Sequence, residues 1–253
     1  MTLSGQDDGL QMDVASHAKF DNVGGMLGGG MGGGIEFNPE KRPSADIISD
    51  IPAQSLGFFV GTDFKTAATN TLDALKQQNG EMFATTEADF KENTGLDLRN
   101  DVLAWMGGDF ALSVGEFDIT QERAPQVVFQ LKLSGDDRAK AASTLDTLIE
   151  KLTGGPQDSV DIGGNKFYSI PNSGVIGVTN DRLLVAVDTA AIFGRTDVDV
   201  NALVEGVTGN LGKGLGTTDK YKEAQKHFPA NSNVMFYMDA ARTRELVEAD
   251  LTG

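Results

Sequence analysis

A chain of 253 residues with 40% hydrophobic and 23% charged residues is expected to fold, as one large domain or two small ones. Its 37 acidic residues against 21 basic ones give a formal net charge of -16, which excludes the basic footprint that nucleic acids and anionic lipid surfaces require. The sequence contains no cysteine, which excludes disulfides, thiolate zinc sites and cysteine nucleophiles.

Residues 1–43 are expected to form an N-terminal segment outside the main domain. No export-signal pattern opens the chain, and no stretch reaches the ~18 apolar residues of a membrane span, so the chain as given is expected to be soluble. Glycine fills most of residues 24–34, which predicts a loop, because the backbone freedom of glycine makes regular structure costly. Pro39 and Pro43 disfavour a helix, so an ordered α+β domain is expected over residues 44–227.

The domain opens with a strand and an amphipathic helix. Residues 56–62 are apolar and aromatic, and the following run places Phe64, Ala68, Leu72 and Leu75 at helical spacing until Gly80 ends it. Residues 98–106 predict a short helix, and the alternation in residues 110–115 predicts a second strand.

The clearest strand and helix follow one another at residues 126–133 and 134–154. In the strand, alternation directs Phe129 and Leu131 to one face and Gln130 to the other, so one face is expected to be wet. The helix carries an apolar stripe that includes Leu145 and Leu148, and it ends at Gly154. The apolar faces of strand and helix are expected to share one core.

Two hairpins and a final strand and helix complete the pattern. The hairpins join residues 159–162 to 166–170 and 175–179 to 182–188, and such short turns imply antiparallel pairing. A weaker helix is expected over residues 217–227. The fold class is therefore α+β, mainly an antiparallel sheet with helices packed on one face and the other face turned to solvent or a partner.

An internal structural repeat is also predicted. Residues 51–59 and 228–236 share Pro, Ala, Ser and Phe at matching positions, and each passage leads into a strand and then a helix. Residues 228–253 therefore resemble the start of a second copy, in which Val234, Phe236 and Met238 are expected to face helices.

The order of these segments resembles the uncharacterised bacterial proteins grouped as domain of unknown function 3352. The motifs that carry the resemblance are IPAQSLGFFVGTDF (51–64), TGLDLRNDVLAWMGGDFALSVG (94–115), the strand and helix over 126–152, RLLVAVD (182–188) and FPANSNVMFYMD (228–239). Members are typically longer and contain related halves, and they tend to start with an export signal or membrane anchor. The resemblance implies an extracytoplasmic protein that reaches a membrane only through an anchor absent from this chain. It supplies no catalytic residues.

Metal and nucleophile chemistry finds little support in the residues. His17 and His227 are the two histidines, too few for an ordinary zinc site. Ser113 lies in FALSVG, where Ala111 replaces the first glycine of a nucleophile elbow, so Ser113 is expected to be structural.

Two loops resemble ligand-binding motifs and depart from them. In residues 209–218, Lys213 follows a glycine, yet Gly214 stands where a phosphate-binding loop needs Ser or Thr. In residues 196–206, Asp197, Asp199 and Asn201 fit the first ligand positions of a calcium loop, yet Ala202 replaces the glycine of its turn.

The remaining candidates have structural interpretations. Asp97 and Asp101 can share a helix face as a carboxylate pair, although Asp97 fits better as a helix N-cap. Trp105 and Met106 are expected in the core. No catalytic, cofactor-binding or metal-binding residue and no cofactor is therefore assigned.

These observations leave three functional classes. The first is a non-enzymatic, extracytoplasmic binding or structural module with a protein or apolar small-molecule partner. The second is a carrier of a lipid or another apolar ligand, held between the sheet and the helices that bear Phe64, Trp105 and Leu145. The third is a hydrolase with dispersed carboxylates, which requires a cleft with two perturbed acidic groups.

Overall fold

The structure, a computed structural model, describes residues 2–6, 9–13, 42–115, 125–155, 159–162, 164–170, 174–189, 200–209, 213–226 and 234–252. The strands are β1 (Thr2–Gln6), β2 (Gly9–Asp13), β3 (Gly57–Gly61), β4 (Phe110–Val114), β5 (Gln126–Lys132), β6 (Ser159–Ile162), β7 (Asn165–Ile170), β8 (Gly174–Val178), β9 (Arg182–Asp188) and β10 (Val234–Met238). The α-helices are α1 (Ala45–Ser49), α2 (Phe64–Gln78), α3 (Gly80–Thr94), α4 (Gly135–Thr153), α5 (Val200–Thr208), α6 (Asp219–Gln225) and α7 (Ala240–Thr252).

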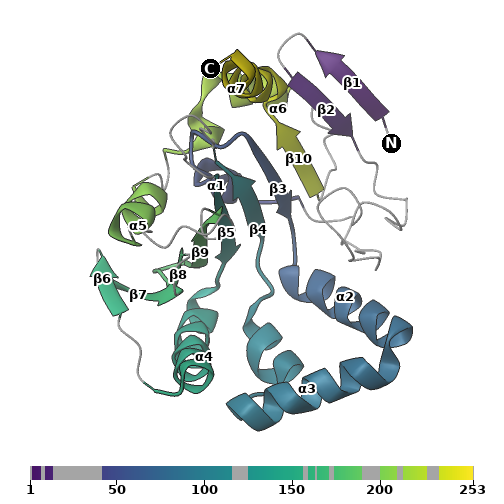
Figure 1. Cartoon of the computed structure of the whole chain (residues 1–253), viewed down its shortest axis with the longest axis vertical. Coiled ribbons are helices and arrows are strands. Elements are labelled where there is room, and N and C mark those ends of the chain that lie inside the picture. Colours follow the sequence, from purple (N-terminus) through teal and green to yellow (C-terminus); the bar gives the residue numbers. More distant parts are fainter. Residues whose placement is uncertain are drawn as a thin grey trace.

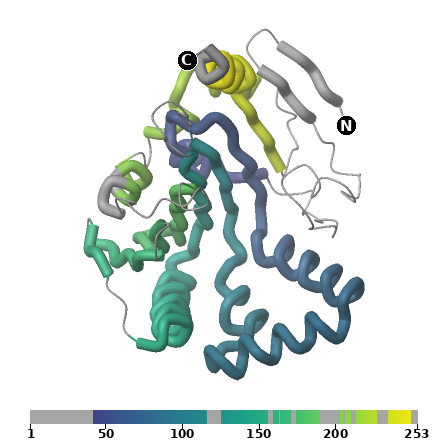
Figure 2. The backbone as a smooth tube through the Cα atoms, viewed as in Figure 1, coloured from purple at the N-terminus to yellow at the C-terminus, as the bar shows by residue number. Residues whose placement is uncertain are grey.

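The strands form one sheet in the order β1-β2-β10-β3-β4-β5-β9-β8-β7-β6, and every described pairing is antiparallel. This confirms the predicted α+β class and both predicted hairpins. Figure 1 shows α2, α3 and α4 at the lower end of the strands and α1, α6 and α7 at the upper end, and Figure 2 follows the same chain path as a tube.

Helices lie on both faces of the sheet, whereas the sequence predicted them on one. The register places Val60, Ala111, Gln130 and Leu184 across from one another, so these residues share one face, which we call the α1 face. Their neighbours Phe59, Leu112, Phe129 and Val185 share the opposite face, which we call the α4 face.

The α1 face carries two buried clusters. The first contains residues of α1, β3, β4, β10 and α6 and of the segments next to α1 and α6, namely Ile47, Ile48, Ile51, Phe58, Val60, Ala111, Leu215, Tyr221, Met235 and Tyr237. The second contains residues of β5, β7, β8, β9 and α5, namely Val128, Phe167, Val175, Leu184, Ala186, Leu203, Val204 and Val207. Together they bury the α1 face from β10 to β7.

The α4 face is buried mainly at its lower end. The cluster there contains Trp105, Phe110, Leu131, Leu133, Ala141, Leu145, Tyr168, Val178 and Leu183, with Phe64 and Phe129 packed beside it. The ring of Phe64 lies 5.2 Å from that of Phe110 and 5.3 Å from that of Phe129. The predicted core therefore holds for Phe129, Leu131 and Leu145, while Leu148 is only half-buried.

The prediction that one face of β5 is exposed to solvent is wrong. Gln130 is completely buried and Val128 is 3% exposed, because α1 and α5 cover the face that carries them. The amide group of Gln130 is satisfied by two internal partners described below, which is the condition under which a polar side chain can be buried.

Several described elements, α1 among them, lie where the sequence predicted none. β1 and β2 form a hairpin within the N-terminal segment, and β2 joins the sheet beside β10. α3 begins at Gly80, which the sequence had marked only as the end of the previous helix. α5 covers β8 and β9, and it overlaps the second half of the calcium-like motif.

The predicted repeat is not shown by the structure. β3 and β10 are antiparallel neighbours, and each leads through an aspartate into a helix: the backbone N–H of Thr66 donates to Asp63, and that of Arg242 donates to Asp239. However, β10 buries Met235 and Tyr237 instead of the predicted Val234, Phe236 and Met238, which lie on the α4 face and stay half-buried.

Candidate functional site

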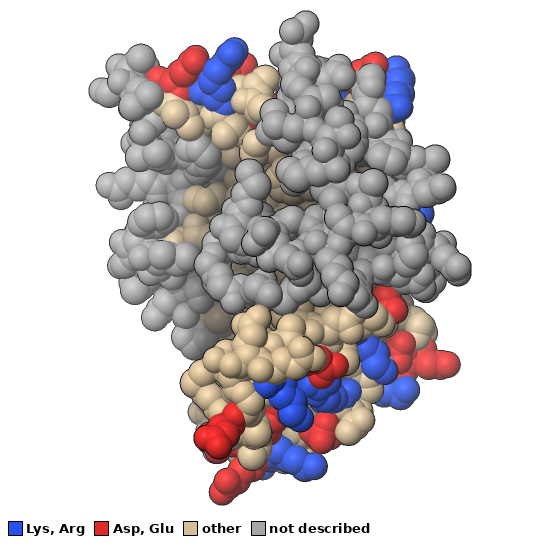
Figure 3. All heavy atoms as spheres, turned by 90° about the vertical axis from the view of Figure 1, so that its right-hand side faces the viewer, with Lys and Arg blue, Asp and Glu red and all other residues tan. Residues whose placement is uncertain are grey.

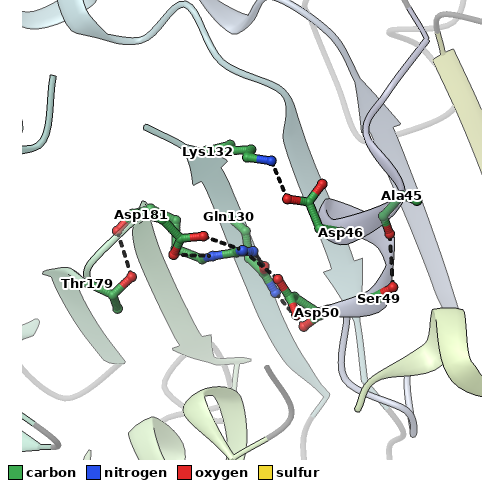
Figure 4. A network of polar contacts seen from close by, with 9 residues as sticks. Ala45, Asp46, Ser49, Asp50, Gln130, Lys132, Thr179 and Asp181 are labelled. Carbon is green, nitrogen blue, oxygen red and sulfur yellow. Dashed lines mark hydrogen bonds and ion pairs between the residues drawn. The ribbon is translucent and has the colours of Figure 1, made fainter. Parts of the chain in front are cut away.

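A network of polar side chains joins α1 to β5 and β9 (Figure 4). Its centre is Arg182, the first residue of β9, whose side chain is 4% exposed. One guanidinium nitrogen, Nη2, lies 2.5 Å from Asp50 Oδ2, and Nη1 donates to Gln130 Oε1 at 3.1 Å. Gln130 Nε2 in turn donates to the backbone oxygen of Asp50 at 2.9 Å. The network therefore fixes the end of α1 to the centre of the sheet.

Asp181 supplies the outer partner of Arg182. Its two carboxylate oxygens accept hydrogen bonds from Nε and Nη2 of Arg182 at 3.1 and 2.9 Å. Burial alone lowers the pKa of Arg182, but the hydrogen bond to Asp181 and the charge of Asp50 outweigh it, so the pKa is raised overall. The hydrogen bond from Arg182 likewise lowers the pKa of Asp181. Both groups are held in their charged forms.

Asp46 and Lys132 form a second link between α1 and β5. Lys132 Nζ donates to Asp46 Oδ2, and this hydrogen bond lowers the pKa of Asp46 to about 2. An acid that donates a proton in catalysis needs a raised pKa, so this shift has the opposite direction. The described charges around α1 are thus paired with one another in a structural clamp.

The glycine-rich run before α6 packs against the same helix. The N–H groups of Gly214 and Leu215 donate to the backbone oxygens of Ser49 and Ile51, both at 2.7 Å. A Cβ atom on Gly214 would lie 1.9 Å from the oxygen of Ile51. Gly214, beside Lys213, therefore serves close backbone packing, in agreement with the departure of this run from a phosphate-binding loop.

A smaller cluster joins β7 to α4. The hydroxyl of Tyr168 donates to Asp146 Oδ1, and Lys166 Nζ lies 4.4 Å from the centre of the Tyr168 ring. Burial raises the pKa of Tyr168, and the hydrogen bond to Asp146 raises it further. A tyrosine that stays protonated is a packing and hydrogen-bonding group, so this cluster also holds a helix to the sheet.

The upper half of the α4 face carries an apolar band, which we define by seven side chains. They are Phe236 and Met238 of β10, Leu112 and Val114 of β4, Val127 of β5, and Val185 and Val187 of β9. None of the three buried clusters of described residues includes them. Each keeps part of its surface exposed, and Val114 is 39% exposed.

The apolar band contrasts with the surface at the lower end of the molecule. In Figure 3 acidic and basic side chains are interspersed over that end. There Arg99 joins Asp73 and Glu87 at 2.8 and 3.0 Å, which ties α2 to α3. The seven side chains of the band include no charged or hydrogen-bonding group.

Several residues singled out from the sequence have structural roles. Asp97 is the predicted N-cap: its carboxylate accepts from the N–H groups of Arg99 and Asn100 at the start of a π-helical turn, Leu98–Val102. The carboxylate of Asp101 accepts a hydrogen bond from the N–H of Asp97 at 2.7 Å, so both carboxylates are used in hydrogen bonds to the backbone of this turn. Trp105 is 3% exposed and Ser113 is 2% exposed, as expected for core positions.

Other predicted candidates lie outside the described residues. These are His17, His227, Asp197, Asp199 and the glycine-rich residues 24–34. Asn201 lies in α5, but its side chain is not described. Within the described ranges, no group of three or more His, Asp or Glu side chains is arranged to hold a metal ion. No described helix has the length and apolar character needed to cross a membrane.

The side chains that were expected to line an enclosed ligand site pack against one another in the described part of the chain. Trp105 and Leu145 belong to one buried cluster, and the ring of Phe64 packs against the rings of Phe110 and Phe129 beside them. Sequence reasoning missed the apolar band, although a signal was present: Leu112, Val114, Val127 and Phe236 all lie at alternating positions of predicted strands.

Comparison with known proteins gives a family and little else. No curated protein matches the chain. One solved structure, "Structure of crystal form I of TP0453", is similar over 77% of this chain and 63% of that chain, with 11% sequence identity and a TM-score of 0.38. The similarity thus spans less than two thirds of that protein, and its score is too low to carry an argument. The family model described as "Protein of unknown function (DUF3352)" matches residues 1–252, and the chain therefore belongs to this family, as its motifs predicted.

Proposed function

We propose that this chain is a binding module, not an enzyme, and that it holds an apolar partner against the apolar band. The single observation that carries this proposal is the band itself: seven apolar side chains keep exposed surface across the middle strands of the sheet. Antiparallel sheets that face water on one side normally carry polar residues there. A sheet face whose Val, Leu, Phe and Met side chains are only half-buried can contact an apolar partner.

The charged groups support a binding role over a hydrolytic one. A hydrolase with dispersed carboxylates needs an acid whose pKa is raised toward neutrality. Around α1 the pKa values of Asp46 and Asp181 are both lowered, by hydrogen bonds from Lys132 and Arg182 respectively. These carboxylates act as fixed anions that hold α1 in place.

An extracytoplasmic location is part of the same proposal. It is supported by the resemblance of the chain to exported members of its family and by its acidic composition. The partner is then expected among apolar molecules met outside the cytoplasm.

The proposal is tested by titration with Nile red, an uncharged dye that fluoresces in apolar surroundings. We compare the wild type with Val114→Gln, in the band, and with Val247→Gln, on α7. The two valines are 39% and 44% exposed, so the substitutions remove similar exposed surface at different places. Dye binding is expected to weaken at least ~5-fold in Val114→Gln and to stay within ~2-fold in Val247→Gln, following the apolar area lost. Equal binding by all three proteins, or no binding by the wild type, contradicts the proposal.

A further inference from the structure

We propose that the occupant of the apolar band is the acyl chain of a neutral or zwitterionic lipid. This inference rests on the proposed function and specifies its ligand. It follows from four properties of the band: its position on a sheet face, its size, its stiffness and its lack of charge.

The position of the band disfavours an extended peptide. The strands β10, β3, β4, β5 and β9 are hydrogen-bonded to one another in an unbroken order, so their backbone groups are already paired. A peptide strand laid on this face would bury its own N–H and C=O groups against apolar side chains without partners, at a substantial cost in free energy. A methylene chain has no such groups.

The size of the band disfavours a second copy of this chain. Five adjacent strands at ~4.8 Å spacing make the band about 19 Å long, and two side-chain rows make it about 10 Å wide. This area of about 200 Å² is far below the ~800 Å² that each partner of a stable protein dimer normally buries. A single extended acyl chain needs only a narrow strip of that length.

The floor of the band is stiff. Val114, Val127 and Val187 are direct cross-strand neighbours, because Val114 pairs with Val127 and Val127 pairs with Val187. β-branched side chains have restricted rotamers, so three adjacent valines present a surface that needs little ordering when a ligand binds. Leu112 and Val185 flank this row on the side nearer to α4.

The charge of the molecule selects the headgroup. The band contributes no cation that could pair with a phosphate or carboxylate, and the whole chain carries a formal net charge of -16. An anionic lipid would therefore be repelled at long range without a local ion pair to compensate. A neutral or zwitterionic headgroup avoids this repulsion.

The inference is tested by displacement of Nile red with lysophosphatidylcholines whose chains range from about 10 to 16 carbons, each used below its micelle concentration. Each added methylene is expected to strengthen displacement about twofold to fourfold, until the chain exceeds the length of the band. Lysophosphatidylglycerol with the same chain, which is anionic, is expected to bind at least ~5-fold more weakly at low salt, and the difference is expected to shrink as salt screens charge.

A double variant and a matched control locate the lipid. Val114→Gln/Val127→Gln is expected to weaken displacement by at least ~10-fold, whereas Leu152→Gln/Val247→Gln, at exposed positions of α4 and α7, is expected to stay within ~2-fold. Thermal unfolding of each variant shows that the fold is intact.

Three outcomes overturn the inference. If Nile red binds at the band but no lysolipid displaces it, the proposed binding function is retained and the proposal of a lipid ligand is rejected. If displacement is independent of chain length, the ligand is not held by its acyl chain. If light scattering shows a wild-type dimer that Val114→Gln/Val127→Gln converts to a monomer, the occupant is a second copy. Absence of Nile red binding instead removes the proposed function itself.

Discussion

Replacement of Arg182 by Met is expected to destabilise the protein more than any conservative change of its partners. The substitution keeps most of the apolar stem but removes the cation that lies 2.5 Å from Asp50 Oδ2. It also removes the hydrogen bond that Nη1 donates to Gln130, a residue with no exposed surface. Breaking a buried ion pair from one side typically costs about 3 to 5 kcal/mol, because a carboxylate remains in a poorly solvated place.

The partner substitution Asp50→Asn gives the contrast. Arg182 then keeps two hydrogen bonds to Asp181, whose side chain is 50% exposed and remains ionised. We therefore expect a smaller loss of about 1 to 3 kcal/mol. Arg182→Lys retains the charge but not the planar set of donors, and it is expected to fall between the two.

Urea unfolding at neutral pH, followed by circular dichroism, measures these free energies. A loss below about 1.5 kcal/mol in Arg182→Met, or a larger loss in Asp50→Asn than in Arg182→Met, would refute the reasoning. Either result would mean that solvent reaches the carboxylate easily, so that the ion pair contributes little to holding α1 on the sheet.

Three further predictions concern packing and pH. Leu145→Ala is expected to lower the free energy of unfolding by about 2 to 5 kcal/mol, because Leu145 is 6% exposed. Leu152→Ala on the same helix is expected to change it by less than about 0.5 kcal/mol, because Leu152 is 66% exposed. Equal losses of the two variants in urea unfolding would show that the assigned buried face of α4 is wrong. Gly214→Ala is expected to lower the free energy of unfolding by about 1 to 3 kcal/mol, because the added Cβ would lie 1.9 Å from a backbone oxygen. An unchanged melting temperature would contradict this close packing. The carboxyl group of Asp46 is expected to titrate near pH 2 when followed by NMR. Because its pKa is lowered from 3.8, the stability that Asp46 contributes is present above about pH 4 and is lost as the pH falls toward 2. Lys132→Met is expected to return the pKa of Asp46 toward 3.8.

The sequence predicts well those helices and strands that are determined by the pattern of neighbouring residues. Alternation in residues 126–133 and the apolar stripe ending at Gly154 gave β5 and α4 nearly to the residue. Gly80 was harder to interpret, because a glycine after an amphipathic run ends one helix and can equally begin the next.

The elements that define the candidate site depend on distant contacts. Gln130 looks like a solvent-facing residue until α1, about 80 residues earlier in the chain, is placed over it. Conversely, Val114 and Phe236 look like core residues, and only the positions of α2 and α4 at the lower end of the sheet show that they stay partly exposed. Periodicity identifies the two faces of a strand but does not identify what covers each face.

The place of β10 between β2 and β3 affects how the chain can fold as it is synthesised. Gly61 pairs with Val234, so one edge of β3 must wait for about 170 further residues, or roughly 10 to 30 s at typical rates of translation. During that time β3 and β4 can pair, but the other edge of β3 presents unused hydrogen-bonding groups next to Phe58 and Val60. The order of strands in the finished sheet thus makes the emerging chain vulnerable to pairing with the wrong strand, and protection of that edge is a requirement for its biogenesis.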